Sequence, residues 1–159
     1  VGVDIAKNAV QVAAKLNKNV TWVVGTGATL PVLDSSIDLC TSLFSPIPKQ
    51  EILRVLKPHA YLMVVTPATG HLYAMREALF EEVNPHEPHK FVTQLEDAFE
   101  LVEASVVDAP LSLSQADLKH LIAMTPYAYK AKPERRQALE QKDQFELKAQ
   151  FQIYLFKKK

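Results

Sequence analysis

The sequence has a single cysteine, Cys40, so an internal disulfide is excluded and a reducing compartment is indicated. Cys40 lies in the apolar run IDLCTSLF, which favours a small core residue over a nucleophile. No apolar run approaches the length of a membrane span, and the first residues show no signal-peptide pattern. We therefore expect a cytoplasmic protein that does not bind a membrane. Internal repeats are also absent.

The sequence also lacks a net charge, because eighteen basic residues balance eighteen acidic ones. This balance argues against a uniformly basic protein that coats nucleic acid. The charge is nevertheless unevenly distributed. Residues 1–126 contain nine basic and fourteen acidic side chains, whereas residues 127–159 contain nine basic and four acidic ones. This asymmetry indicates either an anionic partner for the C-terminal part or a solvated helix with a lysine-rich tail.

The first part of the chain alternates apolar strands with segments of helical spacing. We expect strands at 1–4, 20–24, 37–44 and 60–66, helices at 5–16 and 49–56, and a turn at 57–59. This alternation predicts parallel βαβ units with right-handed crossovers. Ligands of such sheets bind beyond the carboxyl ends of the strands, so the residues that follow each strand are site candidates.

The second part of the chain has a different pattern. Helices are expected at 72–82, 114–124 and 133–141, and strands at 99–107 and 145–156. Ser114 is placed to cap its helix, with Asp117 at the third position. Apolar residues alternate along 145–156, which is typical of an antiparallel edge hairpin added to a parallel sheet.

Asp4 ends the first expected strand, directly before a helix. A carboxylate at this place can accept hydrogen bonds from both ribose hydroxyls of an adenosyl cofactor. It can equally cap the helix that follows. The position alone does not separate the two roles.

Several stretches of the sequence resemble known motifs. GTGATLPVLDSSIDLC and RVLKPHAYLMVV resemble motifs of class I S-adenosylmethionine-dependent methyltransferases, with His59-Ala60 in place of the usual glycine pair. VTPATGHL, EEVNPHEPH and MTPYAYKAKPE resemble the bacterial 23S rRNA guanine-N1 methyltransferases, in which a zinc-binding N-terminal module precedes the methyltransferase domain. The resemblance implies an α/β, Rossmann-like class I methyltransferase sheet, mostly parallel with an antiparallel C-terminal hairpin. It also implies methylation of guanine N1 in 23S ribosomal RNA with S-adenosyl-L-methionine as cofactor.

The family's first strand and its glycine-rich loop, which holds the methionine portion of the cofactor, do not occur in these residues. We therefore expect residues 1–159 to be the C-terminal part of a single methyltransferase domain, truncated at the second strand. Residues 1–70 would be the cofactor side and residues 71–159 the substrate side. We expect the chain alone to be inactive and to bind cofactor poorly, with zinc only in the missing module, if present. The missing first strand would leave a gap in the sheet. We expect this gap to close by direct pairing of the two strands that flank it, or through a second copy in a homodimer.

The resemblance implies cofactor-binding roles for five residues: Asp4, Ile5, Gly27, Ala28 and His71. Gly27 has no side chain to contact adenine, so a contact there would come from backbone groups. His71 follows the pattern of a histidine beside the cofactor. It could equally be a polar residue in the first turn of the helix that follows.

We expect RNA contacts from the substrate side and from Phe44 on the cofactor side. The candidates are Phe44, His86, His89, Tyr127, Tyr129, Lys130, Lys132 and Arg135. Tyrosines interleaved with cations suit single-stranded RNA, although they also suit a core edge beside a solvated helix. The two histidines favour a substrate-facing loop over a metal site, because no second ligand pair lies near them. No catalytic base is identified.

Two alternatives to an RNA methyltransferase stay open at this point. One is a small-molecule methyltransferase of the same fold, whose ligand affinity would not show the salt dependence of RNA binding. The other is a non-catalytic binding module that keeps the fold.

Overall fold

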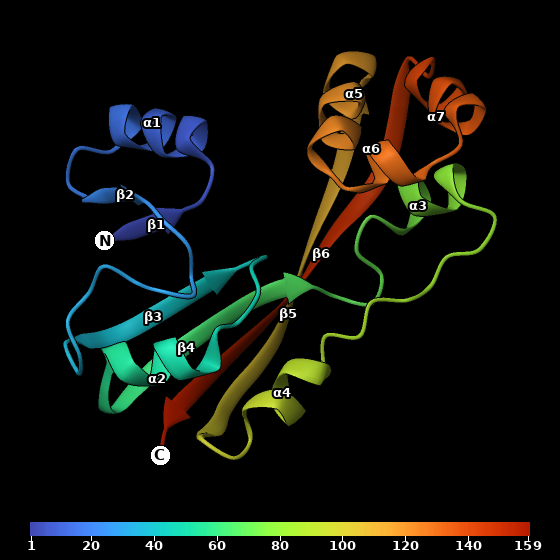
Figure 1. The fold of residues 1–159 in the computed structure, drawn as a ribbon. Helices are drawn as coiled ribbons and strands as arrows, with labels where there is room; N and C mark the ends of the chain where they lie inside the picture. Colours follow the sequence, from blue (N-terminus) through green and yellow to red (C-terminus); the bar gives the residue numbers. More distant parts are fainter. The chain divides into compact units, whose positions relative to one another are not determined.

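The computed structural model describes residues 1–159 and contains six strands and seven helices (Figure 1). The strands are β1 (Gly2–Asp4), β2 (Trp22–Val24), β3 (Ile37–Leu43), β4 (Leu56–Pro67), β5 (Phe99–Ser114) and β6 (Gln144–Lys158). The helices are α1 (Lys7–Leu16), α2 (Lys49–Val55), α3 (Tyr73–Leu79), α4 (Lys90–Leu95), α5 (Gln115–Met124), α6 (Tyr127–Lys130) and α7 (Pro133–Glu140). None of these helices combines the length and apolar character that crossing a membrane requires.

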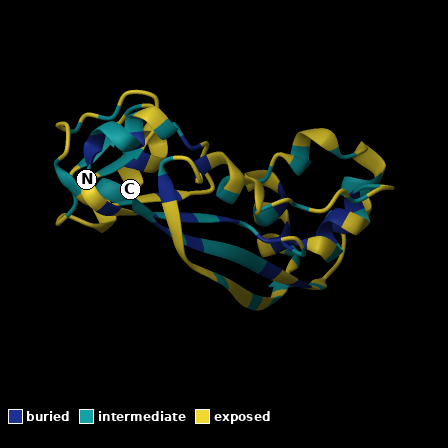
Figure 2. Cartoon of the chain, turned by 90° about the horizontal axis from the view of Figure 1, so that it is seen from below, coloured by how far each residue is buried: buried dark blue, intermediate teal, exposed yellow.

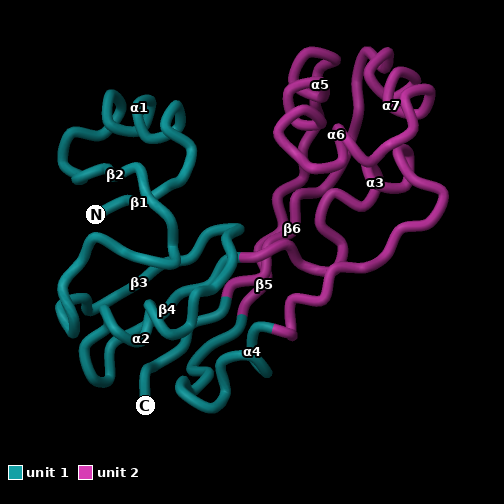
Figure 3. Tube along the Cα trace, in the orientation of Figure 1, with its two compact units in different colours: residues 1–65, 91–104, 154–159 teal, residues 66–90, 105–153 magenta.

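The chain forms two compact units (Figure 3). Unit 1 consists of Val1–Val65, Phe91–Ala104 and Tyr154–Lys159. Unit 2 consists of Thr66–Lys90 and Ser105–Ile153. Strands β4, β5 and β6 each contribute residues to both units.

The strands form two sheets. One is a two-stranded parallel sheet of β1 and β2, and the other has four strands in the order β3-β4-β6-β5. β3 and β4 are parallel, so the predicted parallel βαβ units are confirmed. Direct pairing of β1 with β3 was one of the two expected ways to close the sheet, and it is wrong, because these strands belong to different sheets.

The C-terminal strands are antiparallel. Near one end of the pair, the Gln115 amide donates to the Asp143 carbonyl oxygen at 3.1 Å, and at the other end Lys159 donates to Ala98 at 3.1 Å. The antiparallel hairpin predicted from the sequence is therefore confirmed. Its outer strand is β5, the earlier of the two, whereas β6 lies between β4 and β5.

The turn expected at 57–59 is part of strand β4 in the structure. Ile37 is paired with Leu56 and Leu39 with Tyr61, so four residues of β4 lie opposite Asp38 alone. This insertion is an irregularity that bends the strand locally, as bulges do. His59 lies within it at φ 61°, a left-handed conformation that glycine adopts at much lower cost.

Unit 1 has its own apolar core. Along β4 every second residue from Ala60 to Val64 is buried, as expected for a strand with one face against the core (Figure 2). The aromatic rings of Phe99 and Phe156 meet edge to face, with centroids 6.4 Å apart. Cys40 packs against this core and burial raises the pKa of its thiol, as its apolar context indicated.

Unit 2 packs its helices around a second core. Its buried members are Leu72, Met75, Leu79, Leu118, Ile122, Leu139, Leu147 and Ala149. Helix α5 begins as predicted, because the Ser114 hydroxyl accepts a hydrogen bond from the Asp117 amide at 3.2 Å. Helix α6, which the sequence did not predict, is a single turn of four residues that follows Pro126.

Candidate functional site

Asp4 lies at the carboxyl end of β1 and is exposed. Its Oδ1 accepts a hydrogen bond from the Ala6 amide at 2.7 Å, which closes the turn that leads into α1. Its carbonyl oxygen accepts from the Gly25 amide at 3.0 Å, so the loop after β2 starts beside it. The carboxylate thus closes a two-residue turn before the helix and does not cap it, because Ala6 is the N-cap and has no side-chain cap bond; Oδ2 has no partner within the chain. One carboxylate oxygen therefore faces solvent at the strand end, where a hydroxyl could bind.

The loop after β2 presents free backbone groups. Thr29 donates to the Thr26 carbonyl oxygen at 3.4 Å, which closes a turn around Gly27 and Ala28. The amides of residues 26–28 donate to no other group of the chain. A side chain at Gly27 would lie 3.3 Å from the ring of Pro48, so this loop contacts the segment that follows β3. The loops that follow β2 and β3 therefore meet here, although the two strands belong to different sheets.

These groups fit an adenosyl cofactor. Asp4 could accept from a ribose hydroxyl, and the free amides of Gly27 and Ala28 could donate to adenine nitrogens. Ile5 directly follows Asp4 and is 75% exposed, so its side chain could cover an adenine ring.

Phe44 is the first residue after β3 and adopts φ 52°. The left-handed region is rare for a bulky side chain and is found most often at functional sites. The Phe44 amide donates to the Val65 carbonyl oxygen at 2.9 Å, which holds the backbone there, while half of the residue is exposed. The residue is therefore held in a costly conformation at a strand end.

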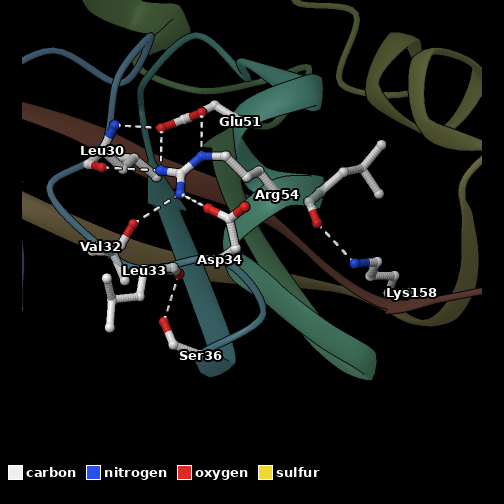
Figure 4. A network of polar contacts seen from close by, with 9 residues as sticks. Leu30, Val32, Leu33, Asp34, Ser36, Glu51, Arg54 and Lys158 are labelled. Atoms are coloured by element: carbon white, nitrogen blue, oxygen red, sulfur yellow. Dashed lines mark hydrogen bonds and ion pairs between the residues drawn. The ribbon is translucent and has the colours of Figure 1, made fainter.

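The chain between β2 and β3 is fixed by one arginine (Figure 4). Arg54 in α2 donates to the carbonyl oxygens of Leu30 at 3.1 Å and Val32 at 2.9 Å. It also pairs with the carboxylates of Glu51 and Asp34. The hydrogen bond from Arg54 lowers the pKa of Glu51 to about 2. The two motifs that carry the methyltransferase resemblance in unit 1 are thus in direct contact.

His71 lies in unit 2 and is buried. Its Nδ1 is 2.8 Å from the carbonyl oxygen and 3.1 Å from the amide nitrogen of Gln150 in β6. Burial lowers the pKa of His71, the Gln150 backbone raises it, and the nearby Arg76 guanidinium lowers it. Burial therefore favours the neutral imidazole, which the Gln150 backbone holds against β6.

His86 is close to His71, with ring centroids 6.2 Å apart. Its Nε2 lies 3.3 Å from the Tyr127 hydroxyl. Burial, followed by the positive charge of Arg76, lowers the pKa of His86 to about 4. Tyr127 also packs its ring edge-on against Phe80, with centroids 5.7 Å apart, so this tyrosine is engaged within unit 2.

The remaining RNA-binding candidates are at the surface of unit 2. Tyr129 is 89% exposed. Lys130, Lys132 and Arg135 line a pocket of about 150 Å³ together with Leu79, Phe80 and Glu81. The structure brings these three cations together at one place, whereas Asp4, Ile5, Gly27, Ala28 and Phe44 belong to unit 1.

His89 is exposed. No group of three or more histidine, cysteine, aspartate or glutamate side chains that could hold a metal ion occurs in residues 1–159.

Sequence reasoning missed two residues near these sites. Gln150 donates its backbone amide to His71, and its side chain accepts from the Gly70 amide at 3.0 Å. Arg76 is 5% exposed and pairs with no carboxylate; it donates to the carbonyl oxygens of His71 and Asn84. Arg76 could have been noticed in the sequence, because it is a basic residue within the apolar helix pattern after His71. Gln150 gave no such signal, because it occupies an ordinary polar position of an alternating strand.

Comparisons with known proteins agree with the fold. Residues 1–64 match the model of the methyltransferase domain family. The chain is 31% identical over 133 residues to the 23S rRNA (guanine(748)-N(1))-methyltransferase of Streptomyces fradiae, covering 82% of this chain and 48% of the relative. A relative from Micromonospora griseorubida, provisionally named as a 23S rRNA guanine-N1 methyltransferase, is 29% identical over 83% of this chain and 45% of its own length. The chain thus spans about half the length of the curated relatives it matches.

Solved structures share the architecture. A SAM-dependent methyltransferase from Methanosarcina mazei superposes with a TM-score of 0.59 at 19% identity, covering 99% of this chain and 80% of that chain. At this identity the likeness shows the fold alone, which is the predicted Rossmann-like one. The family match, the curated relatives and the fold together confirm the predicted resemblance to the 23S rRNA guanine-N1 methyltransferases, and the chain has the fold of the class I S-adenosylmethionine-dependent methyltransferases.

Proposed function

We propose that this chain provides cofactor-binding and RNA-binding surfaces of a methyltransferase that modifies guanine N1 in large-subunit ribosomal RNA. The observation that carries the proposal is the extent of the similarity to the Streptomyces fradiae protein. Its 133 aligned residues exceed the length of either unit, so both units contribute to it. The general methyltransferase domain, by contrast, matches only residues 1–64. Similarity beyond that domain favours a shared substrate class.

In this proposal, unit 1 holds the nucleoside part of the cofactor. Asp4 accepts from a ribose hydroxyl, Ile5 covers the adenine, and the amides of Gly27 and Ala28 bond its ring nitrogens. When bound, S-adenosylmethionine supplies the methyl group. His71 stays a predicted cofactor contact, held in position by the Gln150 backbone.

The chemistry of the acceptor sets what the protein must do. N1 of neutral guanine carries a proton, so methylation at N1 requires that this proton leave. The base must also be unstacked before its Watson–Crick edge can be reached. The exposed Phe44 ring at the end of β3 offers a surface on which such a base can stack. Catalysis then depends mainly on positioning N1 for in-line transfer.

RNA binding is assigned to unit 2. Tyr129 and the three pocket cations supply a stacking surface and phosphate ligands at neighbouring positions. A small-molecule substrate would need neither, which is why the RNA proposal is preferred. The His86–His89 loop belongs to the same unit and is proposed to contact the RNA nearby.

The test is methyl transfer to unmodified large-subunit RNA, carried out with the full-length protein. Label from the cofactor should appear as N1-methylguanosine after nuclease digestion and mass spectrometry. Asp4→Asn should raise the apparent KM for cofactor, and Phe44→Ala should lower the rate of transfer at saturating cofactor. Absence of labelled guanine, or label on another base, would contradict the proposal.

A further inference from the structure

The pocket of unit 2 combines positive charge with one carboxylate. Lys130 ends helix α6, Lys132 is the N-cap of α7, and Arg135 lies in the first turn of α7. Glu81 enters from the segment after α3 and is the only acidic residue lining the pocket. Three cations and one carboxylate leave a net charge of +2 around the pocket. The N-terminal end of α7 adds a further partial positive charge.

Glu81 is bonded to these cations unequally. Its Oε1 lies 2.7 Å from Lys132 Nζ and 3.9 Å from Arg135 Nη2. Arg135 is held separately, because its Nη1 donates to the Phe80 carbonyl oxygen at 3.2 Å. Lys130 makes no ion pair. The pocket thus contains one paired lysine, one arginine fixed by the backbone and one unpaired lysine.

We propose that this pocket binds one phosphodiester of a single-stranded RNA substrate, and that Glu81 is the resident counter-ion which the phosphate displaces. The inference rests on the proposed function for the presence of RNA. It adds a specific phosphate subsite and a residue whose negative charge limits affinity for the substrate.

The energetics allow this exchange. The side chains of Glu81 and Lys132 are 64% and 67% exposed, and exposed ion pairs contribute little to stability. A phosphate brings several acceptor oxygens and can bond Lys130, Lys132 and Arg135 together, whereas Glu81 bonds closely to Lys132 alone. With the phosphate bound, the displaced Glu81 carboxylate is repelled by it and can be solvated at the surface.

The neighbouring tyrosine indicates single-stranded nucleic acid as the source of the phosphate. Tyr129 directly precedes Lys130 and is 89% exposed. An exposed ring one residue from a phosphate ligand suits a base stacked beside its own backbone. A free phosphate or a phosphopeptide would make no use of this ring.

The test is the affinity for a labelled single-stranded RNA of about 12 nucleotides, measured by fluorescence anisotropy over a range of salt concentrations. Glu81→Gln should bind about 3- to 10-fold more tightly at low salt, because no carboxylate has to be displaced, and the gain should shrink as salt screens the charges. Lys132→Gln should bind more weakly, with a salt slope smaller by about 0.7, which corresponds to one phosphate contact. In the double variant, the gain from Glu81→Gln should be smaller than in the wild-type background.

Glu77→Gln is the matched control, because Glu77 lies exposed in α3 and makes no ion pair, yet its replacement changes the net charge equally. Inorganic phosphate should compete only weakly with the RNA, and Tyr129→Ala should weaken RNA binding without altering phosphate competition. An unchanged or weaker affinity of Glu81→Gln, or an equal gain in Glu77→Gln, overturns the inference and leaves the proposed function standing. A wild-type chain without salt-dependent RNA affinity overturns both.

Discussion

Arg54 Nη2 donates a hydrogen bond to the carbonyl oxygen of Leu30 at 3.1 Å (Figure 4). The Leu30 amide in turn donates to Glu51 Oε1 at 2.6 Å, and Glu51 pairs with Arg54. One ion pair of helix α2 therefore satisfies both backbone groups of a single loop residue. The loop between β2 and β3 has no regular structure of its own, so its conformation depends on this helix.

Replacing Arg54 should loosen that loop. We expect Arg54→Met to increase amide exchange and proteolysis over 30–36 and to lower the unfolding midpoint, because two carbonyl oxygens and two carboxylates lose their donor. Arg54→Lys should rescue little, since a lysine lacks the planar donor array. Lys57→Met is the control: it removes only an exposed pair with Asp38, and normal protection in Arg54→Met would refute the assignment.

Lys158 should stabilise unit 1 by donating hydrogen bonds to carbonyl oxygens at the C-terminal end of helix α2. Its Nζ donates to the carbonyl oxygens of Leu53 and Leu56, both at 2.7 Å, where α2 leaves carbonyls without helical partners. Lys158→Met should lower the free energy of unfolding by about 1–2 kcal/mol in urea denaturation. Lys157→Met, one residue earlier, should change it by less than about 0.5 kcal/mol. Equal effects of the two variants would show that the carbonyl contacts do not matter.

Replacing His59 by glycine should make the fold more stable. At φ 61° a residue with a Cβ atom is strained, and removing that atom relieves the strain, partly offset by the greater freedom of glycine in the unfolded chain. We expect His59→Gly to raise the free energy of unfolding by about 0.5–1 kcal/mol. His59→Ala keeps the Cβ atom and should bring no such gain. A gain in the alanine variant would point to the imidazole instead of the backbone.

His86 should make stability depend on pH. In the unfolded chain a histidine takes up a proton near pH 6.5, whereas in the folded chain the pKa of His86 is lowered to about 4. The unfolded state therefore binds more protons between these values, so stability falls as the pH falls from about 6.5 to about 4. Because the imidazole is only partly buried, we expect a loss on the order of 1–2 kcal/mol instead of the full linkage value.

Urea midpoints at several pH values would measure this effect. His86→Gln should give a shallower pH dependence; His71, whose pKa is also lowered by burial, and carboxylates such as Glu51, whose pKa is lowered by its partners, contribute to the remainder. His89→Gln is the control, since His89 is exposed three residues away. A profile in His86→Gln that matches the wild type would contradict the assignment.

Local signals in the sequence predicted the local structure well. Ser114 and Asp117 predicted where α5 begins, and Pro133 stands at the first position of α7, as expected. The strands at the N-terminal part were found from their apolar runs. The predicted strand ended at residue 107, whereas β5 continues to Ser114. Most residues of β5 are exposed, so its pattern of buried and exposed residues alternates only weakly.

Features that depend on distant residues were not predicted. Lys57-Pro58-His59 has the composition of a turn, but pairing of β4 with β3 on both sides turns it into an irregularity within a strand. The contact of Arg54 with Leu30 joins two motifs that were each recognised separately. Similarly, the cations after Tyr127 were noted, whereas the opposing carboxylate of Glu81, about fifty residues earlier, was visible only in the fold.

Strand β5 is the outer strand of its sheet, and one of its edges has no partner strand. Its exposed apolar residues include Val102, Val106 and Val107. An unpaired apolar edge of this kind could pair with a strand of another molecule. Glu100 and Glu103 are exposed on either side of Leu101 and Val102 and make no ion pair, so their like charges repel a second copy aligned along the same edge. These two carboxylates therefore oppose self-association along β5. Neutralising them would make folded molecules associate before it changed the fold itself.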